Sequence, residues 1–245
     1  MGADLELARR LADAADVISL PRFRSGLAIE TKPDLTPVTE ADRAVEVELR
    51  RILADERPGD AILGEEHGAT GSGSRRWILD PIDGTRNYAR GIPVWGTLIA
   101  LEEDGVVQLG MVSAPALSHR WWAERGSGAF ADGDQVHVSA VSRIEDSVLS
   151  FAFEDAVPMI ARRAWHTRGL GDFWPYMLVA EGAVDGAVDA IGVNVWDVAA
   201  MQVVVEEAGG RFSDRQGEPR IDSRSGVASN GLIHDELLAA LAAPS

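Results

Sequence analysis

Two aspartates, Asp80 and Asp83, lie three residues apart, directly after an apolar run at residues 77–79. The run is typical of a short buried strand, which should present both carboxylates at its end. Carboxylates at the ends of buried elements need a cation, a proton or an arginine beside them, because an unpaired buried charge is costly. Hard oxygen ligands are what Mg²⁺ prefers, so this pair predicts a magnesium site.

Further acidic residues lie at the ends of other apolar segments. Glu65 and Glu66 follow a second strand-like run at residues 61–63, and Asp197 opens an apolar helical segment at residues 195–208. Together with the first pair, they supply the oxygen ligands of such a site.

Gly84 and Thr85 follow directly and meet a requirement of phosphate chemistry. Glycine lets a phosphate approach the backbone closely, and threonine offers a hydroxyl. The alternative is that Asp80 and Asp83 are turn residues or solvated charges, since the chain has 39 acidic residues and both Asp-Pro and Asp-Gly are common in turns. The combination of these features favours a metal and phosphate site over turns alone.

The composition limits the class of partner. A formal net charge of −16 over 245 residues disfavours binding to nucleic acid or to an anionic membrane, and a phosphorylated substrate would need bound cations. The absence of cysteine excludes thiolate catalysis and cysteine-based zinc sites. No apolar run approaches about 18 residues and no signal peptide is evident, so we expect a cytoplasmic protein without a membrane span.

Hydrophobic periodicity indicates the elements that must position these residues. Thr39 followed by Asp42 is typical of a helix N-terminus, and this helix should end near residues 57–59. Strand patterns cluster in the first half of the chain, whereas strands and helices alternate in the second half. This order predicts an α+β first half and an α/β second half.

Residues 64–66, 77–87 and 196–199 resemble, in this order along the chain, the signatures of the inositol monophosphatase family. The members of this family are Mg²⁺-dependent, lithium-sensitive phosphomonoesterases. The similarity runs from about residue 5 to 238. It implies a layered α-β-α-β-α sandwich of the inositol monophosphatase and fructose-1,6-bisphosphatase type. It also implies one domain over residues 1–245 with a subdomain seam near residue 133, and a homodimer.

The resemblance implies ligands for two Mg²⁺ ions, which in such sites lie about 3.5–4 Å apart. Glu65, Asp80 and the backbone carbonyl of Ile82 would hold the first ion. Asp80, Asp83 and Asp197 would hold the second, so that Asp80 bridges the two. The site would lie between the two halves of the chain, where pockets commonly form.

The family positions also imply catalytic roles. Asp42 would accept a proton from the Thr85 hydroxyl, which in turn accepts one from the attacking water, and Glu65 joins this pair as a catalytic residue. The backbone N–H groups of Gly84 and Thr85 would hold phosphate oxygens. Glu66 would orient an outer-sphere water or bind a third ion. Asp42 has an alternative role as a first-turn helix residue, and both roles are compatible.

Residues 32–42 and 169–176 resemble the bacterial, actinobacterial-type histidinol-phosphatase branch of the family. By family position Asp172, Asp189 and Asp197 would contact substrate, and two carboxylates facing the leaving group suit the cationic histidinol. Asp172 has the alternative role of a helix N-cap. The spacing from Asp189 to Asp197 is one residue longer than is usual, which leaves the register of Asp189 open.

The resulting hypothesis is an Mg²⁺-dependent phosphomonoester hydrolase that converts L-histidinol phosphate to L-histidinol and phosphate. The first alternative is an inositol-1-monophosphatase or a broad sugar-phosphate phosphatase. The second is a non-catalytic metal-binding protein, although such a protein has no need of Thr85 and Asp42. Assays with histidinol phosphate and inositol 1-phosphate would distinguish these alternatives.

Overall fold

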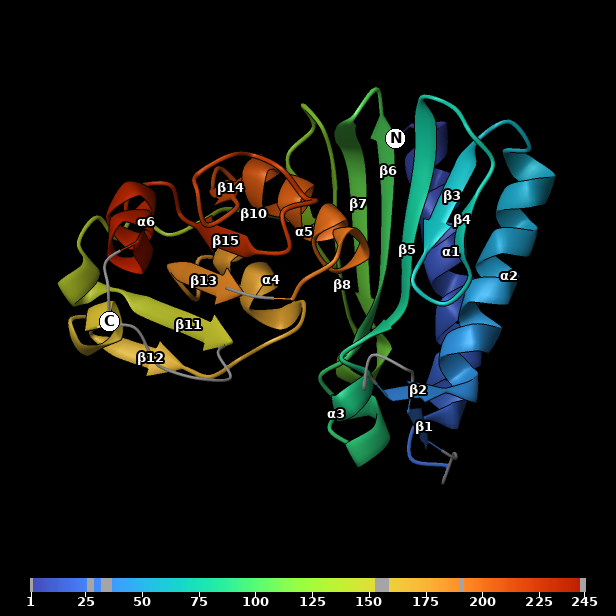
Figure 1. Ribbon diagram of the computed structural model, residues 1–245, viewed down its shortest axis with the longest axis horizontal. Helices are drawn as coiled ribbons and strands as arrows, with labels where there is room; N and C mark the ends of the chain where they lie inside the picture. The colour runs from blue at the N-terminus through green and yellow to red at the C-terminus, as the bar shows by residue number, and fades with distance from the viewer. Residues whose placement is uncertain (1, 26–28, 32–36, 153–158, 190–191, 243–245) are drawn as a thin grey trace.

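Five alternating layers of helix and sheet build the protein (Figure 1). The computed structural model describes residues 2–25, 29–31, 37–152, 159–189 and 192–242. Residues 32–36, part of a segment that carries the histidinol-phosphatase resemblance, lie outside the described residues.

The larger sheet has eight strands in the order β10-β9-β8-β7-β6-β5-β3-β4. Its strands are β3 (Ala61–Gly64), β4 (Gly68–Thr70), β5 (Arg75–Asp83), β6 (Gly96–Glu103), β7 (Val106–Ala114), β8 (His119–Glu124), β9 (Ala129–Ala131) and β10 (Asp134–Val136). β5 runs parallel to β3 and antiparallel to β6. β5 therefore lies inside the sheet, with paired neighbours on both sides.

The smaller sheet has five strands in the order β12-β11-β13-β15-β14. Its strands are β11 (Val148–Ala152), β12 (His166–Arg168), β13 (Gly186–Asp189), β14 (Arg211–Ser213) and β15 (Gly226–Ser229). β1 (Ile29–Thr31) and β2 (Pro37–Thr39) form a separate antiparallel pair. The chain thus completes the larger sheet before it begins the smaller one.

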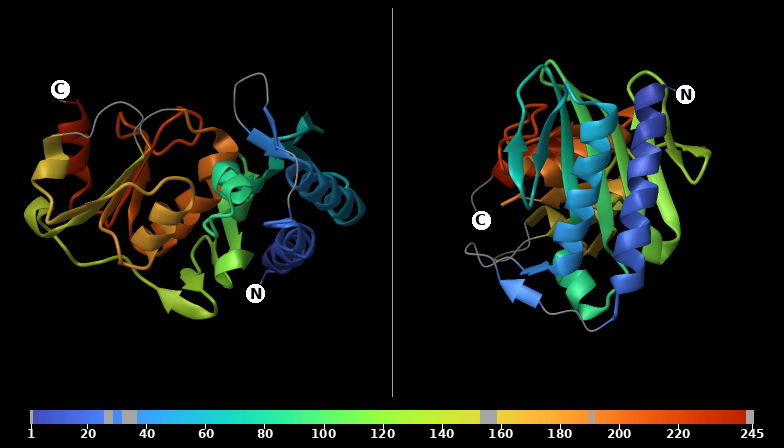
Figure 2. Two further views of the ribbon diagram at one scale, coloured as in Figure 1. Left: turned by 90° about the horizontal axis from the view of Figure 1, so that it is seen from below. Right: turned by 90° about the vertical axis from the view of Figure 1, so that its right-hand side faces the viewer.

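Helices form the remaining layers: α1 (Ala3–Ser19), α2 (Glu40–Glu56), α3 (Thr85–Arg90), α4 (Trp174–Ala180), α5 (Val195–Glu207) and α6 (His234–Ala242). α1 and α2 lie side by side on the outer face of the larger sheet (Figure 2). α4 and α5 lie between the two sheets, and α6 packs on the smaller sheet. The expected layered α-β-α-β-α sandwich is confirmed.

Strand β5 shows how the core orients the site. Trp77 and Leu79 are buried against α1 and α2, whereas Ile78 is buried on the opposite face, toward α5. Side chains alternate between the faces of a strand, so Asp80 follows Ile78 onto the α5 side. We expected the strand to end before Asp80, which is wrong, because β5 continues through Asp83.

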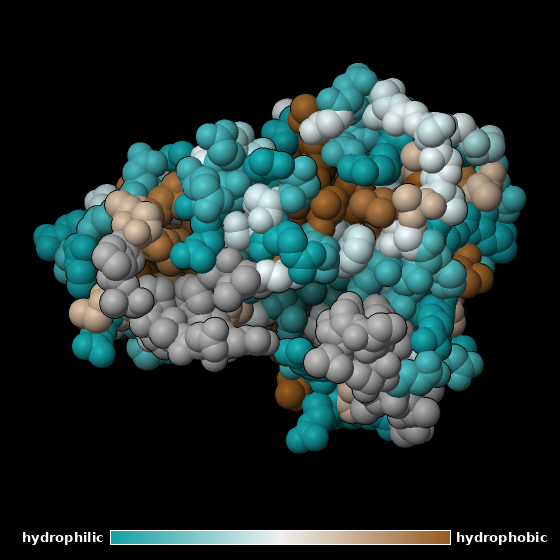
Figure 3. Space-filling model, viewed as in Figure 1, coloured by the Kyte–Doolittle hydropathy of each residue, from teal (hydrophilic) through white to brown (hydrophobic). Residues whose placement is uncertain are grey.

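The surface is consistent with the composition. Hydrophilic residues predominate on the face shown in Figure 3. None of the helices in the described part of the chain combines the length and the apolar character that crossing a bilayer requires.

Candidate active site

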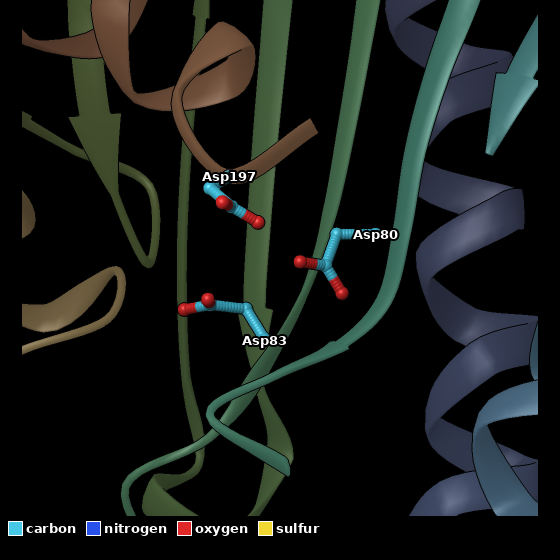
Figure 4. A group of neighbouring side chains, drawn as sticks. All are labelled: Asp80, Asp83 and Asp197. Atoms are coloured by element: carbon cyan, nitrogen blue, oxygen red, sulfur yellow. The ribbon is translucent and has the colours of Figure 1, made fainter. Parts of the chain in front are cut away.

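Three carboxylates converge where the end of β5 meets the start of α5 (Figure 4). Asp80, Asp83 and Asp197 each offer an oxygen, and these oxygens all lie within 4.8 Å of one another. Asp80 Oδ1 is buried and has no hydrogen-bond partner among the described residues. Buried polar atoms are normally paired, so an orphaned carboxylate oxygen facing two further carboxylates fits a divalent cation with oxygen ligands.

The protonation of this group points to the same chemistry. Burial raises the pKa of Asp80 well above its usual range, and the negative charge of Glu65 is the next largest cause. Burial and the charge of Asp172 raise the pKa of Asp83 in the same way. Burial also raises the pKa of Asp197 to about 7. Burial and mutual repulsion thus disfavour three charged carboxylates at this place, and a bound divalent cation would stabilise their charged forms.

An irregularity in β5 explains how Asp80 and Asp83 reach the same point. In a regular strand, residues three apart point to opposite faces. Here the pairing of β5 with β6 shifts register between Asp80, opposite Leu98, and Asp83, opposite Gly96. The shift brings both carboxylates to the α5 side, where Asp197 lies.

Backbone amides orient two of the three carboxylates. Asp83 Oδ2 accepts a 2.6 Å hydrogen bond from the N–H of Phe173. Asp197 Oδ2 accepts a 2.5 Å hydrogen bond from the N–H of Asn194, within a capping box at the start of α5. Each side chain is thus held in place by the beginning of a helix in the layer between the sheets.

The group opens into a cavity of about 630 Å³. Its lining includes most of the side chains expected from the sequence: Glu65, Asp80, Ile82, Asp83, Gly84, Thr85, Asp172, Asp189 and Asp197. Glu65 lies outside the group of three mutually close carboxylates, although its charge raises the pKa values of Asp80, Asp42 and Asp197. The structure therefore brings these nine residues to one cavity, whereas Asp42 and Glu66 are not among the residues that line it.

Asp42 and Thr85 are in contact. The Thr85 hydroxyl is 3.3 Å from Asp42 Oδ1 and 3.0 Å from the carbonyl oxygen of Ile82, and it can donate to one of them at a time. Asp42 Oδ2 accepts hydrogen bonds from the backbone N–H and the hydroxyl of Thr39, which forms the N-cap of α2. Asp42 therefore takes part in the helix cap through Oδ2 and contacts Thr85 through Oδ1 at the same time.

Asp172 does not cap helix α4. The N-cap is Phe173, and Asp172 adopts a left-handed backbone conformation with φ of 59°. Its Oδ2 accepts a 3.0 Å hydrogen bond from the Asn87 side chain. The helix-cap alternative is therefore wrong. Burial raises the pKa of Asp172, while the positive charge of Arg86 opposes that shift.

Asp189 ends β13 and faces the same cavity. Its Oδ2 lies 3.4 Å from the Tyr176 hydroxyl. Burial, aided by the charges of Asp172 and Asp197, raises the pKa of Asp189 to about 7. The longer spacing between Asp189 and Asp197 therefore does not remove Asp189 from the site.

Sequence reasoning missed the residues that donate hydrogen bonds to three of these carboxylates. The side chains of Asn87 and Tyr176 donate to Asp172 and Asp189, and the backbone N–H of Asn194 donates to Asp197. Asn87 stands inside the central motif and had a detectable signal, because it lies one helical turn after Gly84. The contact of Asn194 with Asp197 is also local, because the two residues are three apart, whereas the contact of Tyr176 with Asp189 joins α4 to β13.

The site can be compared with known proteins. The model of the inositol monophosphatase family matches residues 4–244. The chain belongs to the inositol monophosphatase family. As a member of this family it has the fold and the acidic site of a phosphatase that acts on small phosphorylated substrates.

Individual relatives are similar over nearly the whole chain. A histidinol-phosphatase of Mycobacterium tuberculosis (strain ATCC 25618 / H37Rv) is 52% identical over 254 residues, covering 97% of each chain. A histidinol-phosphatase of Streptomyces coelicolor (strain ATCC BAA-471 / A3(2) / M145) is 48% identical, covering 96% of this chain and 95% of that protein.

Solved structures agree with the fold. The extragenic suppressor protein suhB from Bartonella henselae superposes with a TM-score of 0.92 at 29% identity, covering 100% of both chains. An IMPase of Thermotoga maritima superposes with a TM-score of 0.90 at 32% identity, covering 98% of this chain and 97% of that one.

Proposed function

We propose that this protein hydrolyses L-histidinol phosphate to L-histidinol and inorganic phosphate, using Mg²⁺ at the carboxylate cluster. The observation that carries the proposal is one cavity in which a metal-capable group of three carboxylates faces two more, Asp172 and Asp189. Negative side chains beyond the metal group suit a cationic leaving group such as the ammonium and imidazole of histidinol. Relatives at 52% and 48% identity bear the name histidinol-phosphatase, which supports this substrate.

The metal ligands follow from the donors present. Glu65, Asp80 and the Ile82 carbonyl would hold one Mg²⁺, and Asp80, Asp83 and Asp197 a second. The orphaned Asp80 Oδ1 supports the bridging role. Bound Mg²⁺ would neutralise phosphate charge and make a water more acidic.

The protein would move the proton through Thr85 and Asp42. The Thr85 hydroxyl accepts a hydrogen bond from the attacking water and donates its own hydrogen to Asp42 Oδ1, 3.3 Å away. The backbone N–H groups of Gly84 and Thr85 hold the phosphate oxygens. Gly84 has φ of 78°, and an added Cβ would lie 3.1 Å from the Val94 carbonyl oxygen and 3.3 Å from Asp172 Oδ2, so the backbone conformation and the packing here favour glycine. Glu66 orients an outer-sphere water or binds a third ion.

Phosphate release from histidinol phosphate and from inositol 1-phosphate, measured side by side with Mg²⁺, tests the proposal. Each charge-assisted contact is worth roughly 1.5–3 kcal/mol. The kcat/KM for histidinol phosphate should therefore exceed that for inositol 1-phosphate by about tenfold or more. Preference for inositol 1-phosphate would favour the inositol-phosphatase alternative, and no hydrolysis of either would favour a metal-binding protein. Light scattering on the same sample tests the homodimer, which remains a prediction.

A further inference from the structure

Glu46 is a fully buried carboxylate outside the group described above. It lies on α2, and none of its surface is exposed. Glu46 Oε2 accepts a 2.7 Å hydrogen bond from the backbone N–H of Glu66, and Oε1 accepts a 3.1 Å hydrogen bond from the N–H of His67. A buried charge thus contacts the turn between β3 and β4, which carries the candidate ligand Glu65.

Gly64 shows how closely this carboxylate approaches the turn. A Cβ added to Gly64 would lie only 2.1 Å from Glu46 Oε1, so a side chain at this position would displace the Glu46 carboxylate. On the other side, the N–H of Glu65 donates a 3.2 Å hydrogen bond to the carbonyl of Leu79 in β5. The backbone around Glu65 is therefore held from both α2 and β5.

Arg50 completes the support from α2. Its Nε donates a 2.7 Å hydrogen bond to Glu46 Oε1, and its other guanidinium nitrogens donate to the Thr70 hydroxyl, at 2.9 Å, and to the carbonyl of Gly68. Glu46 and Arg50 thus bind the turn between β3 and β4 on both sides: Glu46 accepts from its backbone N–H groups, and Arg50 donates to a backbone carbonyl. The charge of Glu46 is thereby matched by one guanidinium and two amides, as a buried carboxylate requires.

The positions of these residues along α2 link the turn to the proton acceptor. Asp42, Glu46 and Arg50 are four residues apart, which places them on one face of the helix. Asp42, which contacts Thr85, lies one helical turn before Glu46, which contacts the backbone N–H of Glu66. One face of α2 therefore reaches both parts of the site.

We propose that Glu46 is a positioning residue that sets the place of the Glu65 carboxylate by holding the backbone after it. The inference rests on the proposed metal binding by Glu65. Glutamine at position 46 keeps one carbonyl oxygen but presents an NH₂ group where a backbone amide needs an acceptor. Groups that orient a metal ligand typically alter metal affinity by about 10- to 100-fold when they are changed.

Glu46→Gln in the full chain tests the proposal, with Glu48→Gln as the matched control. Glu48 lies on the same helix but pairs with the exposed Arg51. Calorimetry on metal-free protein should show Mg²⁺ binding about 10- to 100-fold weaker in Glu46→Gln and unchanged in Glu48→Gln. Hydrogen exchange at the amides of Glu66 and His67 should be faster only in Glu46→Gln. The kcat at saturating Mg²⁺ should stay near that of the wild type.

Wild-type Mg²⁺ affinity and unchanged amide exchange in Glu46→Gln would overturn this inference alone. A wild-type protein that binds no Mg²⁺ would overturn the proposed function as well. If Glu46→Gln does not fold, Glu46→Asp replaces it, because this variant keeps the charge but is too short to reach both amides. Weaker Mg²⁺ binding in Glu46→Asp supports the proposal, and wild-type binding refutes it.

Discussion

Asp83 accepts its hydrogen bond from the N–H of Phe173, a residue 90 positions later in the chain. Asp83 ends β5 in the larger sheet, whereas Phe173 caps α4 in the layer between the sheets. The neighbour of Phe173 is Asp172, the candidate contact for the leaving group. This one bond therefore couples the metal group to the part of the cavity that would select the substrate.

Removal of metal should abolish activity. EDTA should stop phosphate release and added Mg²⁺ should restore it, because uncompensated carboxylates would repel the phosphate. Among the ligand variants, Asp80→Asn should lose most activity, since Asp80 would bridge both ions. Burial and neighbouring charges raise the pKa of Asp80, so the variant should melt no lower than the wild type without metal. Full activity with unchanged Mg²⁺ dependence would exclude the two-metal site.

Loss of the Thr85 hydroxyl should slow the reaction without weakening substrate binding. Thr85→Ala should lower kcat by roughly 10²–10⁴-fold, the usual effect of a positioned proton acceptor. Thr85→Ser, which keeps the hydroxyl, is the control and should retain most activity. Titration of a non-hydrolysable analogue should give similar Kd values for all three proteins. A weakened Kd with unchanged kcat would contradict the assigned role.

Asp42→Asn should also lower kcat by about 10²–10⁴-fold, but it has a second effect. Asp42 belongs to the capping box of α2, and loss of a cap typically costs about 1 kcal/mol of stability. The variant should therefore melt at a lower temperature than Thr85→Ala. Equal melting temperatures would show that the cap survives, whereas a normal kcat would remove Asp42 from the proton path.

Asp172→Asn should change substrate preference. The kcat/KM for histidinol phosphate should fall about ten- to hundredfold, because one charge-assisted contact is lost. Hydrolysis of glycerol 2-phosphate, whose leaving group is neutral, should barely change. The asparagine carbonyl can still accept from Asn87, so the local structure should persist. An unchanged ratio between the two substrates would remove Asp172 from the leaving-group contact.

The stability of the metal-free protein should depend on pH through Asp189. Its pKa is raised to about 7 by burial and by the charges of Asp172 and Asp197, against about 3.9 in an unfolded chain. Between these values the folded state binds more protons, so the free energy of unfolding should fall as the pH rises from about 4 to about 7. Melting curves in EDTA should show a shallower decline for Asp189→Asn.

Asp222 provides a control of opposite sign. Its hydrogen bond with Arg220 lowers the pKa of this exposed carboxyl. Asp222→Asn should therefore leave the decline between about pH 4 and 7 in place. An identical decline in the wild type and Asp189→Asn would contradict the raised pKa of Asp189.

Local patterns in the sequence were sufficient where the interactions are local. Thr39 and Asp42 are three residues apart, and their reciprocal hydrogen bonds form within one helical turn, so the start of α2 could be predicted. The acidic site followed from the motifs around Asp80 and Asp197, and the layered fold from the resemblance of these motifs to the inositol monophosphatase family. The acidic site was predictable because hydrophobic periodicity and residue types whose burial needs a cation are both visible in the chain itself.

Only the tertiary structure decided how the side chains converge. Regular strand geometry would separate Asp80 from Asp83, and a shift in the pairing of β5 with β6 brings them together. Asp172 does not cap α4, and its carboxylate instead accepts a hydrogen bond from Asn87, 85 residues earlier. These outcomes depend on which segments the packed layers place side by side. The sequence determined the chemistry available, and long-range packing determined the geometry in which that chemistry is held.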